Sequence, residues 1–141
     1  MKFIVNLDVD DLEQGVRFYS AAFGLGVGRR FGNSGVEMLG SSTPIYLLVK
    51  ERETLAADTS AQRRTYDRHW TPVHLDFLVD DIESAVEKAV AAGANLEKPV
   101  MTQKWGRLAL MSDPFGHGFC FVQFLGRGYD EIADVGGQGA D

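Results

Sequence analysis

The sequence predicts an α+β fold built from two tandem βαβββ repeats. The first observation is an internal match: segments 5–13 and 75–83 align at an offset of 70 residues, with a valine, two aspartates and a glutamate identical. The second is the alternation of apolar residues before each Asp-Asp pair, which is typical of a strand with one buried face. The third is the helical spacing of apolar residues after each pair. Two copies of one folding unit explain these observations together.

Each repeat begins with a strand and a helix whose ends are marked by capping residues. Asp11 and Asp81 are predicted to cap the helix N-termini, and Gly24 and Gly93 to end the helices. Apolar runs between Gly, Asn, Ser and Pro turns predict the remaining strands over residues 27–31, 36–39, 45–49, 96–100, 107–111 and 119–124.

The repeats cover residues 2–50 and 71–126, and together they form one predicted domain over residues 1–126. Residues 51–70 form a charged connector in which some helix is expected. Residues 127–141 are expected to be a partly disordered tail. A chain of 141 residues matches the usual size of one domain.

Composition excludes several classes of protein. No apolar run approaches the ~20 residues that span a bilayer, and the first apolar stretch is too short for a signal peptide, so we expect a cytoplasmic protein without a membrane partner. A net charge of −6 argues against nucleic acid as a partner. A single cysteine, Cys120, excludes an intrachain disulfide framework and a cysteine-rich zinc site.

The chain resembles the vicinal oxygen chelate superfamily, which includes glyoxalase I, bleomycin- and fosfomycin-resistance proteins and extradiol dioxygenases. The resemblance rests on the two strand-Asp-helix openings, on Phe18-Tyr19 with Phe23-Gly24-Leu25, and on Asp113-Pro114-Phe115-Gly116-His117, which is similar to the family's Asp-Pro-x-Gly-Asn/His turn. It covers both repeats. It implies a curved mixed sheet around a ligand cavity, and a homodimer.

The resemblance also implies four positions for metal ligands, which are occupied here by Ile4, Tyr46, His74 and Cys120. The hard divalent ions of the family's enzymes require several carboxylates and imidazoles, and these positions offer one imidazole and no carboxylate. His74 and Cys120 alone are one ligand short of a catalytic zinc site. We therefore expect no metal and no other cofactor; a divalent metal at His74 is the alternative.

Strand alternation places Asn6 in the first repeat, and His74 and Asp76 in the second, on the sheet face away from the helix. Buried polar groups without partners cost about 1–3 kcal/mol each, so a polar-lined pocket explains them. The alternative for Asp76 is a place near a strand end, in water. The expected ligand-binding residues, which include flat aromatic surfaces and one cation, are Asn6, Tyr46, His74, Asp76, Trp105, Arg107 and Cys120.

Cys120 and the three histidines have further interpretations. Asp76 lies close enough along the strand to orient His74, so His74 is the expected catalytic base if the protein is an enzyme. Cys120 is a nucleophile only as a thiolate, and otherwise it is a small buried apolar residue. His117 is expected to serve the geometry of its turn. His69, next to Trp70, is a possible part of a lid.

The leading functional hypothesis is a metal-free protein that binds a small organic molecule between the repeats, as a bleomycin-resistance protein does. The alternative is a lyase, isomerase or dioxygenase of the same superfamily that uses a displaced metal site or His74 as base. An interaction protein with a collapsed cavity is disfavoured, because Asn6, His74 and Asp76 would then be internal polar groups that need other partners.

Overall fold

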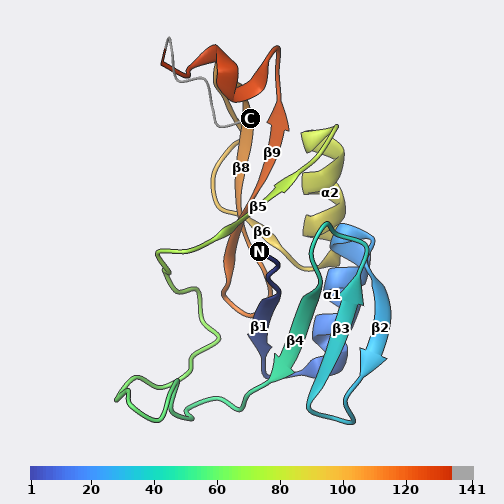
Figure 1. The fold of residues 1–141 in the computed structure, drawn as a ribbon, viewed down its shortest axis with the longest axis vertical. Helices are drawn as coiled ribbons and strands as arrows, with labels where there is room; N and C mark the ends of the chain where they lie inside the picture. The colour runs from blue at the N-terminus through green and yellow to red at the C-terminus, as the bar shows by residue number, and fades with distance from the viewer. Residues whose placement is uncertain (135–141) are drawn as a thin grey trace.

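The computed structural model describes residues 1–134 and has an α+β fold with two βαβββ modules stacked along its long axis (Figure 1). Module 1 contains, in chain order, β1 (Val5–Val9), α1 (Leu12–Phe23), β2 (Gly26–Arg30), β3 (Gly35–Leu39) and β4 (Ile45–Val49). Module 2 contains β5 (Leu75–Leu78), α2 (Ile82–Ala92), β6 (Asn95–Leu96), β7 (Met101–Thr102), β8 (Gly106–Ser112) and β9 (Gly118–Phe124). A short 3-10 helix, η1 (Gly128–Glu131), follows.

The two modules have equivalent sheets. Module 1 has the strand order β1-β4-β3-β2, with β1 parallel to β4. Module 2 has the order β5-β9-β8-β6, with β5 parallel to β9, and β7 pairs with β8. The register pairs Asn6 with Tyr46 in the first sheet and Asp76 with Cys120 in the second. The predicted repeat is confirmed, and the fold contains two mixed sheets where one curved sheet was expected.

The helix caps lie where the sequence predicts them. The Asp11 carboxylate accepts a hydrogen bond from the Gln14 amide at 3.0 Å, and the Asp81 carboxylate accepts one from the Ser84 amide at the same distance. Gly24 (φ 69°) ends the first helix and Gly93 ends the second, both in the left-handed region, which glycine adopts without steric cost.

Aromatic side chains join the two modules, whose helices adjoin (Figure 1). The Phe23 ring, at the end of α1, lies 4.3 Å from the Phe77 ring and 5.3 Å from the Phe119 ring, measured between centroids. Val9 and Phe121 belong to the same buried core. The helix of each module covers the apolar face of that module's sheet, and Phe23 links the two modules.

Two segments differ in detail from the prediction. Of the strand expected over residues 96–100, only Leu96 lies in a strand, because β6 ends there and β7 begins at Met101, beyond Pro99, which has no amide hydrogen to donate. Residues 51–70, all described, contain no helix; an isolated bridge joins Leu55 to Arg63, and the Arg64 guanidinium donates to the carbonyl oxygens of Leu55 and Ala56. Hydrogen bonds from the Arg64 side chain, rather than a buried apolar face, hold this connector together.

The end of the chain is partly described. The predicted tail contains η1, and the rest of that prediction, residues 135–141, lies outside the described residues. Among residues 1–134, no helix has the length and hydropathy needed to cross a membrane.

Candidate functional site

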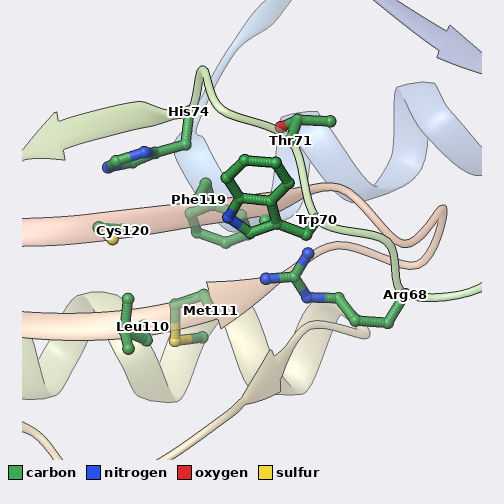
Figure 2. Close-up of a pocket in the computed structure, with 9 residues that line it drawn as sticks. Arg68, Trp70, Thr71, His74, Leu110, Met111, Phe119 and Cys120 are labelled. Carbon is green, nitrogen blue, oxygen red and sulfur yellow. The ribbon is translucent and has the colours of Figure 1, made fainter.

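Two neighbouring cavities lie where the connector meets the modules. The junction cavity, of about 430 Å³, opens between β1 of module 1 and the first residues of β5 and β9 in module 2. The lid pocket, of about 220 Å³, lies on the face of β8 and β9 that is turned away from α2, and the end of the connector passes over it (Figure 2). Thr71, His74 and Phe119 line both cavities, so the two cavities adjoin and together make up the candidate site.

Three of the predicted site residues meet on one face of module 2. His74 directly precedes β5, Asp76 lies within it, and Cys120 is the register partner of Asp76 on β9. His74 Nε2 lies 3.1 Å from Asp76 Oδ1, and His74, Asp76 and Cys120 each offer a metal-ligand atom within 4.8 Å of the others. Figure 2 shows His74 and Cys120 at the same side of the lid pocket. This group is called the His74 triad below.

The Cys120 thiol is protonated at neutral pH. The side chain is 3% exposed. Burial, followed by the nearby Asp76 carboxylate, raises the pKa of the Cys120 thiol to about 12. Without a bound cation to replace its proton, Cys120 therefore has the properties of a small buried apolar side chain and lacks those of a nucleophile.

The lid over this face is formed by the end of the connector, Arg68 to Thr71. Arg68 is ion-paired with Glu97 of module 2, and the Trp70 indole is 81% exposed. Both side chains line the lid pocket (Figure 2). Sequence reasoning identified His69 as a possible lid residue and missed Arg68, Trp70 and Thr71. The available signal was an aromatic pair, His69-Trp70, in an otherwise polar segment.

The face of module 1 carries a separate polar group. Tyr46 donates a hydrogen bond to Glu37 and accepts one from Arg29, both at 2.8 Å. Glu37 is 7% exposed, and its hydrogen bonds with Arg29 hold the pKa of the carboxyl down to about 2. This network joins β2, β3 and β4, so Tyr46 already has partners. Asn6, its register partner, lines the junction cavity instead.

Besides Tyr46, two predicted site residues lie away from both cavities. The Trp105 ring packs against Tyr129, with centroids 5.0 Å apart. Arg107 lies on the α2 side of β8, where it donates to Glu83 at 2.7 Å. The structure therefore brings His74, Asp76 and Cys120 together, with Asn6 in the junction cavity that His74 also lines. It does not bring Tyr46, Trp105 or Arg107 to them.

A buried carboxylate fixes the turn between β8 and β9 in the cavity wall. Asp113, 2% exposed, accepts hydrogen bonds from the amides of Phe115 at 2.8 Å and His117 at 2.9 Å. Its second oxygen accepts from the Tyr19 hydroxyl of α1 at 2.6 Å. Burial and the Asp113 charge raise the pKa of Tyr19 well above its ordinary value. The turn is thereby joined to module 1.

Comparison with known proteins identifies the family of this chain. The sequence model of the glyoxalase-like domain matches residues 4–122. The chain belongs to this family. A segment of 54 residues is 35% identical to an uncharacterized protein of Mycobacterium bovis, and this match covers 38% of the chain and 36% of that relative.

Solved structures confirm the fold of this glyoxalase-like domain. A glyoxalase/bleomycin resistance protein/dioxygenase family enzyme from Burkholderia phytofirmans superposes with a TM-score of 0.69 at 20% identity, covering 86% of this chain and 97% of that one. The genomically encoded fosfomycin resistance protein from Listeria monocytogenes superposes with a TM-score of 0.69 at 18% identity, covering 94% and 98%. Lactoylglutathione lyase from Agrobacterium tumefaciens gives 0.62 at 17% identity, covering 87% and 92%. These similarities establish a shared architecture.

The glyoxalase-like domain places the four positions expected for metal ligands on two different modules. Ile4 and Tyr46 are on module 1, where neither offers a metal-ligand atom of the usual kind. His74 and Cys120 are on module 2, where Asp76 adds a carboxylate that does not occupy one of those positions. The donor set of this chain is therefore concentrated within module 2.

Proposed function

We propose that this glyoxalase-like protein binds a small organic molecule in the junction cavity and the lid pocket, without a resident metal. The observation that supports the proposal is the pair of adjoining cavities, one of which has the exposed Trp70 indole in its lining. Ligand sites are concave, mainly apolar and furnished with a few polar groups, which describes this lining. An exposed tryptophan also offers a planar apolar surface to a bound ring.

Specific side chains have distinct roles in this proposal. Trp70 and Phe119 provide apolar contact surfaces, and Asn6 and His74 provide hydrogen bonds. Asp76 orients the His74 imidazole through the 3.1 Å contact. Tyr46, Trp105 and Arg107 are left out of the site because they line neither cavity and contact Glu37, Tyr129 and Glu83 instead.

Fluorescence of Trp70 tests this proposal. The chain has two tryptophans, so Trp105→Phe leaves Trp70 as the only indole. We expect saturable changes in its emission with at least one of three probes suggested by the similar proteins: fosfomycin, bleomycin and S-lactoylglutathione. In the same background, His74→Ala should weaken binding about tenfold, which corresponds to one lost hydrogen bond.

The matched control is Asn95→Ala, which removes an exposed polar side chain of module 2 outside both cavities. This variant should bind as tightly as the parent. No response to any of the three probes, or equal affinity in the parent and His74→Ala, would count against the proposed site.

A second function is favoured by one observation, the His74 triad. With Asp76 included, three ligand atoms lie within 4.8 Å, which is the number that catalytic zinc sites use. A borderline-soft ion such as zinc accepts imidazole, carboxylate and thiolate ligands. These residues would hold the ion, which would supply Lewis-acid chemistry for a lyase or isomerase reaction. The dioxygenase alternative would need a redox-active ion, such as iron, in its place. Without a metal, His74 is the proposed base of such an enzyme.

Repeating the titration after chelator treatment separates the two functions. Under the leading proposal, the affinity for the probe is unchanged by a chelator, and elemental analysis finds no stoichiometric metal. Loss of binding on chelation, restored by zinc in the parent protein and not in Cys120→Ser, would contradict the metal-free proposal and support the second function.

A cytoplasmic homodimer completes the proposal. Both sheets retain exposed apolar side chains on the face away from the helices, including Ile4 on module 1 and Leu78 on module 2. A second copy would cover such surfaces. Light scattering at micromolar concentration should give about twice the chain mass of 15.5 kDa. A monomer at that concentration would exclude the dimer.

A further inference from the structure

Outside the His74 triad, the other two histidines of the chain meet in the cavity wall. His69 belongs to the connector, and His117 belongs to the turn between β8 and β9. His69 Nε2 and His117 Nδ1 are 3.2 Å apart, with the ring planes at 84°. Both side chains are partly buried and line the junction cavity. These two nitrogens are called the inner nitrogens below.

The outer nitrogens of both rings face backbone carbonyl groups. His69 Nδ1 is 2.8 Å from the Asp67 carbonyl oxygen, and His117 Nε2 is 2.6 Å from the Asp8 carbonyl oxygen. A carbonyl oxygen only accepts hydrogen bonds, so each outer nitrogen must carry a hydrogen. A neutral imidazole has one N–H group. Two neutral rings would therefore turn two lone pairs toward each other across 3.2 Å.

A third hydrogen resolves this conflict. If one inner nitrogen is protonated, it donates to the other, and all three short contacts become hydrogen bonds. The pair then carries three hydrogens on two rings and a single positive charge. Hydrogen bonds to charged groups are also stronger than those between neutral groups, which favours this state in a partly buried wall.

Charged groups around the pair favour a cation. The carboxylates next to it are those of Asp8 on β1, Asp67 on the connector and Asp113 in the turn; the nearby cations are Arg64 and Arg68. Arg64 is ion-paired with Asp8 at 3.0 Å and Arg68 with Glu97. Within residues 1–134, the Asp67 and Asp113 carboxylates have no ion-pair partner. The remaining titratable groups in the surroundings are Tyr19, Tyr66 and His74.

We propose that His69 and His117 form a latch held by one shared proton, which ties the connector to both modules. The hydrogen-bonded series runs from the Asp67 carbonyl through His69 and His117 to the Asp8 carbonyl, so it joins the connector, module 2 and module 1. Loss of the shared proton leaves two opposed lone pairs, and one of the three bonds must then break.

The latch is one of the contacts that hold the lid. Trp70 directly follows His69, so loss of the shared proton loosens the lid at this point. The Arg68–Glu97 ion pair and the hydrogen bond from the His69 amide to the Gly116 carbonyl oxygen, at 3.2 Å, remain. The lid is held most firmly while the pair keeps its proton, and it is loosened when a rise in pH removes that proton. The importance of the lid for ligand access rests on the proposed function. The proposal that the two histidines share a proton does not depend on that function.

A double-mutant cycle measures the latch without any ligand. The free energy of unfolding is determined by urea denaturation for the parent, His69→Ala, His117→Ala and the double variant, at pH about 6.5 and about 8.5. The folded pair holds one proton, whereas two separate imidazoles of the unfolded chain hold none at high pH and two at low pH. The stabilisation is therefore greatest near the ordinary imidazole pKa of about 6.5, and it is lost as pH rises because the pair gives up its proton. We expect a favourable coupling at pH about 6.5 that disappears at pH about 8.5.

The matched control is His74→Ala, which removes the third histidine and leaves the pair intact. The pH-dependent coupling between His69 and His117 should persist in this background. Coupling that is equal at both pH values would overturn the latch, as would independent uptake of a proton by each ring in histidine ¹⁵N NMR spectra.

The lid itself is followed by Trp70 emission in the Trp105→Phe background. We expect the emission to change over the same pH interval as the coupling, and to lose that change in His117→Ala. A pH-independent emission would overturn control of the lid. Because no ligand is added, these measurements test the latch even if the protein binds none of the probes. Equally, the binding titration tests the proposed function even if the two histidines share no proton.

Discussion

Replacing Asp113 with alanine is expected to lower the free energy of unfolding by about 3–5 kcal/mol. The variant leaves three buried donors without an acceptor: the Tyr19 hydroxyl and the amides of Phe115 and His117. Each unsatisfied buried group costs about 1–3 kcal/mol, and partial relaxation of the turn lowers the sum. The loss is large because the same carboxylate closes the turn of module 2 and binds α1 of module 1.

Urea denaturation followed by circular dichroism measures this loss. Tyr19→Phe is the matched control, since it removes one of the three hydrogen bonds and keeps the ring in the core. It should cost about 1–2 kcal/mol. A loss below about 1 kcal/mol for Asp113→Ala would mean that the turn does not depend on this carboxylate.

Phe23→Ala is expected to destabilise the protein by about 2–3 kcal/mol, below the range of about 3–5 kcal/mol for a fully buried phenylalanine, because the Phe23 ring is partly buried against the core. Its ring lies 4.3 Å from Phe77, 5.3 Å from Phe119 and 5.6 Å from Phe121 between centroids, so its removal takes away aromatic contacts between the modules. Phe31→Ala is the matched control, because Phe31 is 44% exposed, and it should cost less than about 1 kcal/mol.

Urea denaturation also reveals how the modules depend on each other. If Phe23 joins them, Phe23→Ala should either unfold cooperatively at a lower midpoint or separate into two transitions. An unchanged midpoint would show that the halves are held together elsewhere.

The repeated fold could be predicted because its signals are local. Alternating residues before Asp11 and Asp81, and helical spacing after them, need no knowledge of distant contacts. The proximity of His74 and Asp76 followed from strand alternation in the same way. The family resemblance added Cys120 by placing it at an equivalent position on the neighbouring strand.

The missed residues depend on non-local contacts. The connector has no apolar periodicity, so the aromatic pair at its end indicates a lid without showing which surface Trp70 lies against or that His69 meets His117. The position of Arg107 was undetermined for a different reason: Leu108 and Leu110 alternate with Ala109 and Met111, so both faces of the strand are apolar and the pattern does not identify the inner one.

A crystal structure of the untagged protein, purified without chelator and soaked with the probe that changes Trp70 fluorescence, tests whether these cavities bind an organic molecule without a metal. We expect electron density for an organic molecule in the junction cavity or lid pocket, in contact with His74 and Trp70. Cavities closed by side chains would contradict it. So would a metal ion bound by His74, Asp76 and Cys120 at the distances of about 2.0–2.3 Å that zinc ligands adopt.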